Sequence, residues 1–311
     1  MEHVSVLLEE TVSLLQVKPD GIYADGTLGR GGHARLLLSK LHSGHLYAFD
    51  KDEQAIEESK VNLHEYLDKV TMIHSDFRAM KEELASRGVY EVDGIMMDLG
   101  VSSPQFDDPS RGFSYRQDAR LDMRMDRSQT LDAYTIVNTY PKQELIRVLR
   151  DYGEERYASS IAGNIERIRR DHPIETTMQL VEAVRSALPA KELRKKGHPA
   201  KQTFQALRIE VNDELNALRK GLEEALDLLA PGGRCAVITF HSLEDRIVKQ
   251  TFKDYSSAPF VEPKLPLTAE QMEQASFHLV TAKPVTATEE ELNENHRSHS
   301  AKLRVIERIR G

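Results

Sequence analysis

Short apolar runs alternate with helical patterns through the N-terminal third of the chain. The apolar runs have the length of strands and lie at residues 22–25, 44–49, 69–74 and 92–97. Helical patterns follow them after short connections, around residues 36–41, 52–66 and 78–87. Because neighbouring parallel strands need a crossover connection, this alternation predicts a doubly wound sheet with helices on both faces. Apolar residues at helical spacing over residues 3–16 predict a further helix ahead of the first strand.

The middle of the chain departs from this alternation. Residues 98–127 form a long segment rich in arginine, aspartate and aromatic residues, which indicates either a working loop at a site or a domain linker. Helical patterns follow near residues 131–139, 142–151, 155–170 and 177–187, and an uninterrupted one spans 203–229. The sequence Ala-Pro-Gly-Gly at 230–233 then predicts a stop before a fifth strand at 234–240, and an alternating strand comes last.

These patterns predict an α/β protein with an all-α domain inserted between the fourth and fifth strands. The expected bounds are residues 1–108 and 209–311 for the core and residues 109–208 for the insertion. The net charge of −8 argues against a polyanionic partner, but residues 109–208 hold 19 Lys and Arg against 13 Asp and Glu. A basic segment in an acidic protein is compatible with a solvated surface, and it also indicates a nucleic-acid partner.

Cysteine content and hydropathy narrow the class of protein further. The single cysteine, Cys235, lies in an apolar run and is expected in the core, and one cysteine cannot form an intramolecular disulfide framework. No apolar run reaches the roughly 18 residues of a membrane span, and the N-terminal residues are acidic, unlike a secretory signal. We therefore expect a cytoplasmic protein without a membrane partner. His296 and His299 lack further ligands at metal spacing, so no metal site is expected.

A glycine-rich loop follows the first strand and reads Asp-Gly-Thr-Leu-Gly-Arg-Gly-Gly-His over residues 25–33. Strand, glycine loop and helix in this order let the backbone approach a nucleotide-like ligand, although a tight turn without a ligand is the simpler alternative. Four successive strands also end in or lead into carboxylates, at Asp25, Asp50, Asp76 and Asp98. The carboxyl ends of parallel strands share one edge, where ligands bind, and Asp50 has the spacing of a ribose contact.

The spacing of the glycines separates two classes of ligand. A dinucleotide site uses G-x-G-x-x-G to set a helix N-terminus against a pyrophosphate, which the carboxylate of Asp25 would repel. A carboxylate suits a cationic ligand such as S-adenosylmethionine, with its ammonium and sulfonium groups. Candidate donor-binding residues are therefore Asp25, Gly29, Gly31, Gly32 and Asp50. At this point the sequence resembles the class I methyltransferases.

Further motifs are spread over nearly the whole chain: His3–Glu9, Asp25–His33, Asp98–Gln105, Arg111–Ser114, Leu121–Asp126, Tyr152–Arg156, Thr203–Leu215, Phe240–Arg246 and Ser300–Arg304. In combination they closely resemble the bacterial MraW (RsmH) family. The resemblance implies a class I (Rossmann-like) methyltransferase core with a mostly parallel seven-stranded sheet and an inserted helical substrate-recognition domain. It also implies an S-adenosylmethionine-dependent enzyme that methylates N4 of a specific cytidine in small-subunit (16S) ribosomal RNA, at the decoding centre.

The resemblance carries over to individual positions of this sequence. The residues that it places at the donor are Gly31, Gly32, His33, Asp50 on the ribose, Phe77, Asp98 and Gln105. The role of Gln105 rests on the resemblance alone. S-adenosylhomocysteine is the expected product, and small-subunit ribosomal RNA within an assembled or nearly assembled subunit is the expected partner. The oligomeric state stays open, with a homodimer among the options.

The expected reaction requires side chains that bind the amine of the substrate and accept its proton. An exocyclic cytosine amine is a poor nucleophile, so the enzyme must orient it and take up a proton. Asp98 and His241, each expected at a strand end, are the candidate catalytic residues, and the alternative is that Asp98 only binds the donor. Phe106, Phe113 and Tyr115 are candidates for stacking on an extruded base, or for packing.

Two departures from related patterns limit what can be transferred. Residues 98–101 read Asp-Leu-Gly-Val where many amino-methyltransferases have Asp/Asn-Pro-Pro-aromatic, so their base-binding geometry does not apply. His299 stands where an arginine is expected in relatives, which would weaken an RNA contact at neutral pH. The alternatives that stay open are a methyltransferase for DNA or a small-molecule amine, an NAD-type oxidoreductase, and a ribosome assembly factor that binds the donor without turnover.

Overall fold

The computed structural model describes residues 5–258 and 275–310. The chain divides into two compact units, which we call unit 1 (Met1–Gly100 and Leu215–Gly311) and unit 2 (Val101–Glu214). The assignment of residues 109–208 as a substrate-recognition domain stays a prediction. Among the described residues, we find no helix that combines the length and the hydropathy of a membrane span.

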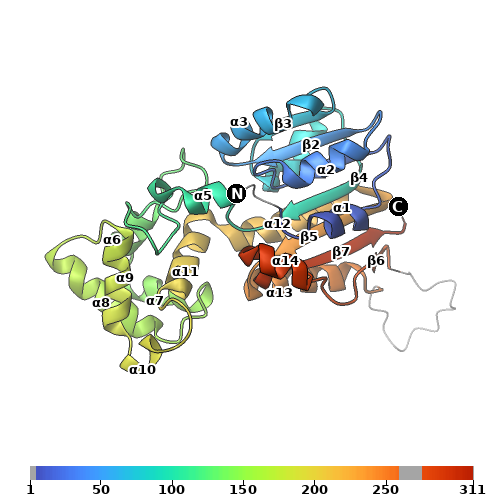
Figure 1. Ribbon diagram of the computed structural model, residues 1–311. Helices are drawn as coiled ribbons and strands as arrows, with labels where there is room; N and C mark the ends of the chain where they lie inside the picture. Colours follow the sequence, from blue (N-terminus) through green and yellow to red (C-terminus); the bar gives the residue numbers. More distant parts are fainter. Residues whose placement is uncertain (1–4, 259–274, 311) are drawn as a thin grey trace, which may run out of the picture. The chain divides into compact units, whose positions relative to one another are not determined.

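Unit 1 is built on one sheet. In the described residues, seven strands pair in the order β3-β2-β1-β4-β5-β7-β6 (Figure 1). β1 to β5 run parallel, whereas β7 is antiparallel to both β5 and β6. The strand bounds are β1 Ile22–Asp25, β2 His45–Asp50, β3 Val70–His74, β4 Val92–Asp98, β5 Leu229–Thr239, β6 Phe277–Leu279 and β7 Lys302–Arg308. The predicted mostly parallel seven-stranded α/β fold is confirmed.

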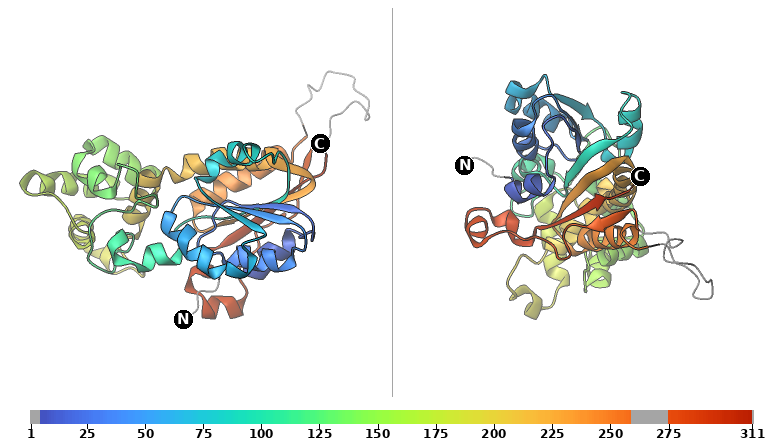
Figure 2. Two further views of the ribbon diagram at one scale, coloured as in Figure 1. Left: turned by 90° about the horizontal axis from the view of Figure 1, so that it is seen from above. Right: turned by 90° about the vertical axis from the view of Figure 1, so that its right-hand side faces the viewer.

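The central strands bury both of their faces because successive side chains point into two different cores. Along β4, Ile95 and Met97 belong to one core and Met96 to the other. Helices cover both sides of the sheet (Figure 2). The core of Met96 includes residues of α1 (Leu8–Leu14), α2 (Gly32–Lys40) and α3 (Glu53–Asn62), and the other core includes residues of α4 (Met80–Ala85), α12 (Glu214–Leu228) and α13 (Ser242–Tyr255). Apolar strands covered on both faces are typical of a parallel sheet.

Two element boundaries differ from the prediction. The helical pattern over 203–229 is divided into α11 (Lys201–Asn212) and α12, because Asp213 takes a left-handed conformation with a φ of 50° that ends α11. Strand β5 begins at Leu229, directly after α12, and residues 231–233 interrupt its pairing with β4, which passes from the pair of Val92 and Leu229 to the pair of Gly94 and Arg234.

Shorter elements complete unit 1. They are η1 (His64–Tyr66), η2 (Phe77–Ala79), α14 (Glu289–Glu294) and η4 (His296–Ser300). Of the helix predicted over residues 3–16, α1 covers the part from Leu8 to Leu14, while residues 3 and 4 lie outside the described residues. Strand β6 and helix α14 were not predicted, because three to six residues are too few for a periodic pattern.

Unit 2 is helical, as predicted for the insertion. Its helices are α5 (Ser103–Asp107), η3 (Pro109–Arg111), α6 (Ala133–Thr139), α7 (Lys142–Asp151), α8 (Ala158–Asp171), α9 (Thr177–Ala187), α10 (Ala190–Leu193) and α11. They enclose a core of their own, in which Leu145, Ile161 and Leu180 are fully buried. The predicted insertion of an all-α block between the fourth and fifth strands is confirmed.

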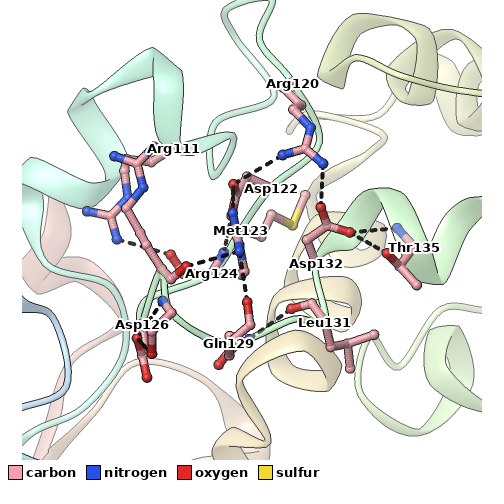
Figure 3. A network of polar contacts seen from close by, with 12 residues as sticks. Arg111, Arg120, Asp122, Met123, Arg124, Asp126, Gln129, Leu131, Asp132 and Thr135 are labelled. Atoms are coloured by element: carbon pink, nitrogen blue, oxygen red, sulfur yellow. Dashed lines mark hydrogen bonds and ion pairs between the residues drawn. The ribbon is translucent and has the colours of Figure 1, made fainter.

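Paired charges hold the long segment that precedes α6 (Figure 3). Arg124 donates to Asp122 through Nε and Nη2, each at 2.8 Å. Arg120 Nη2 lies 2.7 Å from Asp132 Oδ2, and Arg111 Nη2 donates to the Arg124 carbonyl at 3.0 Å. Much of the arginine and aspartate that marked this segment as a site or a linker therefore serves internal pairing within unit 2.

The aromatic residues of the same segment pack inside unit 2. Phe113 is only 4% exposed and belongs to the core, so of its two predicted roles the structure supports packing. Phe106 is partly buried against the same core. Tyr115 stacks on His198 with ring centroids 4.3 Å apart and meets the Phe204 ring edge to face. Tyr115 therefore already forms an aromatic stack.

Candidate active site

The first strand leads into α2 through the glycine loop. Gly29 and Gly31 have φ angles of 53° and 78°, a conformation that L side chains rarely adopt. A Cβ added to Gly31 would lie 2.9 Å from Leu63 Cδ1, so a side chain does not fit there without displacing its neighbour. Gly31 directly precedes α2, whose first-turn N–H groups lack carbonyl partners within the helix. At the end of β1, the loop therefore presents glycine backbone that no side chain of its own covers and the N–H groups of the first turn of α2.

Asp50, at the end of β2, closes this loop from the neighbouring strand. Its Oδ2 accepts a hydrogen bond from Gly29 N at 2.8 Å, and its Oδ1 accepts one from Asp52 N at 2.9 Å. Burial raises the pKa of Asp50, although these two backbone hydrogen bonds oppose the shift. The predicted site residues Gly29 and Asp50 are thus brought together, 21 residues apart in the chain.

Thr27 joins the ends of β1 and β4. Its N–H donates to Asp25 Oδ1 at 3.0 Å, and its hydroxyl oxygen accepts the N–H of Asp98 at 2.6 Å. Sequence reasoning missed this residue, although its place two positions after Asp25 in the glycine loop could have suggested it. Thr27 therefore links the carboxylate of Asp25 to the backbone of Asp98.

Asp25 and Asp98 are acids without a basic partner. Among the described residues, no lysine or arginine forms an ion pair with either carboxylate, and the enclosed Oδ1 of Asp98 has no hydrogen-bond partner. Burial and the neighbouring charges of Asp25 and Glu244 raise the pKa of Asp98 to about 8, against the opposing charge of Arg297. Burial, aided by the charge of Asp50, raises the pKa of Asp25 to about 7 despite the hydrogen bonds of Thr27.

His33 lies between the glycine loop and Asp98. Its Nε2 is 3.0 Å from the carbonyl oxygen of Val6, which can only accept, so Nε2 carries the proton. Its Nδ1 faces Asp98 Oδ2 at 3.8 Å, beyond hydrogen-bond distance. Burial lowers the pKa of His33 to about 4, and the hydrogen bond to Val6 opposes this only in part. A neutral His33 therefore cannot neutralise Asp98 near pH 7.

His241, at the end of β5, begins α13. Its Nδ1 accepts the Glu244 N–H at 3.4 Å in a capping box, in which Glu244 Oε2 accepts the His241 N–H at 3.3 Å. Its Nε2 is enclosed and lies 3.1 Å from Glu244 Oε1, but the contact lacks hydrogen-bond geometry, and Nε2 has no partner among the described residues. Since Nδ1 accepts, Nε2 carries the proton in the neutral ring.

Buried acids without an ion-pair partner among the lysines and arginines of the described residues suit a cationic, polar ligand. A buried carboxylate without a cation is costly, and a bound ammonium or sulfonium would remove that cost. The acids Asp25, Asp50 and Asp98, the bare loop backbone and the enclosed Asp98 Oδ1 therefore fit S-adenosylmethionine. When bound, that donor would supply an electrophilic methyl group.

Three further predicted site residues have other surroundings. Phe77, in η2, lies where a Cβ on Gly221 of α12 would collide with its ring, so its ring packs on this glycine. Gly32 is close to Ser5, because a Cβ there would collide with the Ser5 hydroxyl. Gln105 belongs to unit 2, where its Oε1 accepts the Ser102 N–H at 3.1 Å. The donor contacts of Phe77, Gly32 and Gln105 stay predictions.

The strand order, the glycine loop and the acidic strand ends define a class I methyltransferase. The model of the MraW methylase family matches residues 1–309, and the chain belongs to this family. The protein is therefore an S-adenosylmethionine-dependent methyltransferase, and the family suggested by the sequence motifs is confirmed.

Solved structures similar to this chain include three methyltransferases. An inferred rRNA methylase from Clostridium thermocellum is 14% identical, with 99% of this chain and 100% of that chain covered and a TM-score of 0.47. An rRNA methylase from Streptococcus thermophilus is 11% identical, with 99% and 100% covered and a TM-score of 0.44. An inferred methyltransferase from Streptococcus mutans, in complex with S-adenosylhomocysteine, is 13% identical, with 98% and 99% covered and a TM-score of 0.44. Because these TM-scores are below 0.5, the assignment rests on the family match.

Proposed function

We propose that the protein methylates the exocyclic N4 of a specific cytidine in small-subunit ribosomal RNA, at the decoding centre. The observation that carries the proposal is a pair of enclosed polar atoms, Asp98 Oδ1 and His241 Nε2, which lack hydrogen-bond partners in the described residues. Asp98 is the last residue of β4 and pairs in register with Ile238 of β5, and His241 lies two residues beyond the end of β5. One atom accepts and the other donates, as a base that carries an amine beside acceptor atoms requires.

Asp98 is the group that handles the amine. Transfer breaks the bond between sulfur and methyl carbon and forms a bond between that carbon and N4, and N4 then gives up one proton. The Asp98 carboxylate accepts a hydrogen bond from the amine, which orients the nitrogen, and it takes up this proton. A pKa of about 8 makes the carboxylate a stronger base than an ordinary aspartate, and the positive charge of a bound donor would favour its ionised form near neutral pH.

His241 holds the base. Its protonated Nε2 donates to an acceptor atom of the cytosine, and the capping box with Glu244 fixes the ring. His241 therefore orients the cytosine, so that binding energy is used to place N4 in a near-attack geometry.

Unit 2 supplies an RNA-binding surface in this proposal. Residues 191–196 include the exposed Lys191, Arg194 and Lys196, which form no ion pair with the described residues. Desolvation and the charges of Arg185 and Arg116 lower the pKa of the nearby His198. Unpaired cations beside an aromatic stack suit RNA phosphates and an unstacked base.

The test gives the protein isotope-labelled S-adenosylmethionine and small ribosomal subunits from cells that lack the gene. Mass spectrometry of the digested RNA is expected to find the label in N4-methylated cytidine. Asp98→Asn is the matched variant, because it keeps the size of the side chain and removes the base. We expect it to lower the turnover number at saturating donor by at least about 100-fold.

Each other outcome has a defined meaning. Label in duplex DNA, in a small-molecule amine or in another nucleoside would contradict the proposed acceptor. Tight S-adenosylhomocysteine binding without transfer to any subunit preparation would favour an assembly factor. Unchanged turnover in Asp98→Asn, with weaker donor binding alone, would limit Asp98 to the donor.

A further inference from the structure

Residues 5–7, which we call the N-terminal strap, lie against the donor loop of unit 1. Val6 accepts a hydrogen bond through its carbonyl from His33 Nε2 at 3.0 Å. A Cβ on Gly32 would collide with the Ser5 hydroxyl, so the strap touches the first residue of α2 as well. Two neighbouring residues of the predicted donor site, Gly32 and His33, are thus in contact with the strap.

The strap is held in an unfavourable conformation. Leu7 has a φ of 51° and a ψ of 38°, the left-handed region that a leucine side chain disfavours. The same residue is fully buried. Something outside the strap must therefore hold this conformation, because the local backbone preference opposes it.

Glu291, in α14, provides that anchor. Its Oε1 accepts the Leu7 N–H at 2.9 Å, across 284 residues of the chain. Figure 1 shows α14 near α1, whose first residue follows Leu7. Without this acceptor, the amide of a buried residue would lose its partner at the start of α1.

Glu291 is itself fixed by its surroundings. Its N–H donates to the Thr288 hydroxyl oxygen at 3.2 Å, and its carbonyl accepts the Asn295 N–H at 2.7 Å. The Ser298 hydroxyl reaches the same carbonyl at 3.4 Å. The side chain is therefore presented to Leu7 from a helix whose two ends are tied down.

We propose that Glu291 is a positioning residue for the methyl donor: by holding the Leu7 amide, it keeps the strap against Gly32 and His33 and so shapes the donor loop. The chain of contacts runs from Glu291 through Leu7 and Val6 to His33, whose Nδ1 faces Asp98. The proposal rests on the dependence on S-adenosylmethionine and not on the identity of the RNA target.

Calorimetric binding of S-adenosylhomocysteine to the full chain tests the proposal without any RNA. Glu291→Ala removes the acceptor and is expected to raise the dissociation constant about tenfold. Glu291→Gln keeps an amide oxygen as acceptor and is expected to stay within about threefold of the parent. Glu290→Ala, at the exposed neighbouring position, is the matched control and should leave the constant unchanged.

A double-mutant cycle with His33→Ala separates positioning from general destabilisation. If Glu291 acts through the strap on His33, the effects of the two substitutions on the dissociation constant are less than additive. The melting temperature is followed for each variant in parallel. Parent-like binding by Glu291→Ala, or strictly additive effects in the cycle, would overturn the proposal. If the effects in the cycle are less than additive but no cytidine is methylated, the role of Glu291 stands and the proposed RNA acceptor is wrong.

Discussion

Two regions of this molecule contain buried aspartates, and the two regions shift aspartate pKa values in opposite directions. In unit 2, Asp122 and Asp132 each face an arginine, and the hydrogen bonds of Arg124 lower the pKa of Asp122 although burial alone would raise it. At the sheet edge of unit 1, Asp25 and Asp98 have no such partner among the described residues, and their pKa values are raised to about 7 and about 8. Removing one partner of a buried pair is destabilising, whereas a buried acid without a pair is a candidate position for a bound cation.

The same comparison explains the Arg- and Asp-rich segment of residues 98–127. By composition it is as good a candidate for a ligand site as the glycine loop. In the structure, the bidentate contact between Arg124 and Asp122 leaves both groups committed to each other. Abundance of charge is therefore a weaker indicator of function than charge without a partner.

The largest expected effect concerns the paired region. Asp122→Ala leaves the partly buried Arg124 without its carboxylate, so we expect the free energy of unfolding to fall by about 3 kcal/mol. Urea unfolding measures the loss, and S-adenosylhomocysteine binding should stay at the parent level. Arg127→Ala, at an exposed position of the same segment, is the control and should change stability little.

A small stability change in Asp122→Ala would break the comparison. It would mean that the pair repays only its own desolvation, as many ion pairs do. Loss of donor binding would place the segment in the donor site after all.

The next effect concerns the unpaired acids and depends on pH. An acid whose pKa rises on folding binds more protons in the folded than in the unfolded state at intermediate pH. For Asp98 the pKa rises from 3.8 to about 8, so the free energy of unfolding of the ligand-free protein should decrease as the pH rises through this window. Asp98→Asn should flatten that decrease, as measured by urea unfolding at several pH values between about 5 and 8.

Asp122 provides the matched comparison for this slope. Its pKa is lowered, so its contribution to stability is present above the unfolded-state value and is lost only in acid. Asp122→Asn should therefore leave the slope between about pH 5 and 8 unchanged. An identical slope in the parent and in Asp98→Asn would show that Asp98 is solvated or paired in solution.

The smallest expected effect concerns exposed cations, which water already solvates. Arg116 and Arg185 are exposed, and their charges act on His198 next to the proposed RNA-binding cations. Arg116→Ala combined with Arg185→Ala should weaken RNA binding and reduce the slope of log K against log salt by about 0.7 for each phosphate that is no longer neutralised. Filter binding at several salt concentrations measures this slope. Lys60→Ala, on α3 of unit 1, is the control for loss of a surface charge. An unchanged slope would remove these arginines from the RNA-binding surface.

Several parts of the candidate site follow from sequence patterns. Strand-ending carboxylates and glycine spacing predicted Asp25, Asp50, Asp98 and the loop, because parallel strands must present their carboxyl ends at one edge. The contacts of Thr27 and Glu291 did not follow, since each depends on a partner far away in the chain. Phe113 is the opposite case, because the sequence allowed it either a stacking or a packing role and only its burial in the structure favours packing.

The order of apolar and polar residues was enough to determine the α/β class, the inserted helical block and the family, because periodicity and motifs are local properties of the chain. Only the tertiary structure decided which acids meet an arginine and which do not. It also decided that a strained N-terminal strap is held by Glu291. Pairing and burial set the free energy of each charge, and both depend on residues that the chain brings together only when it folds.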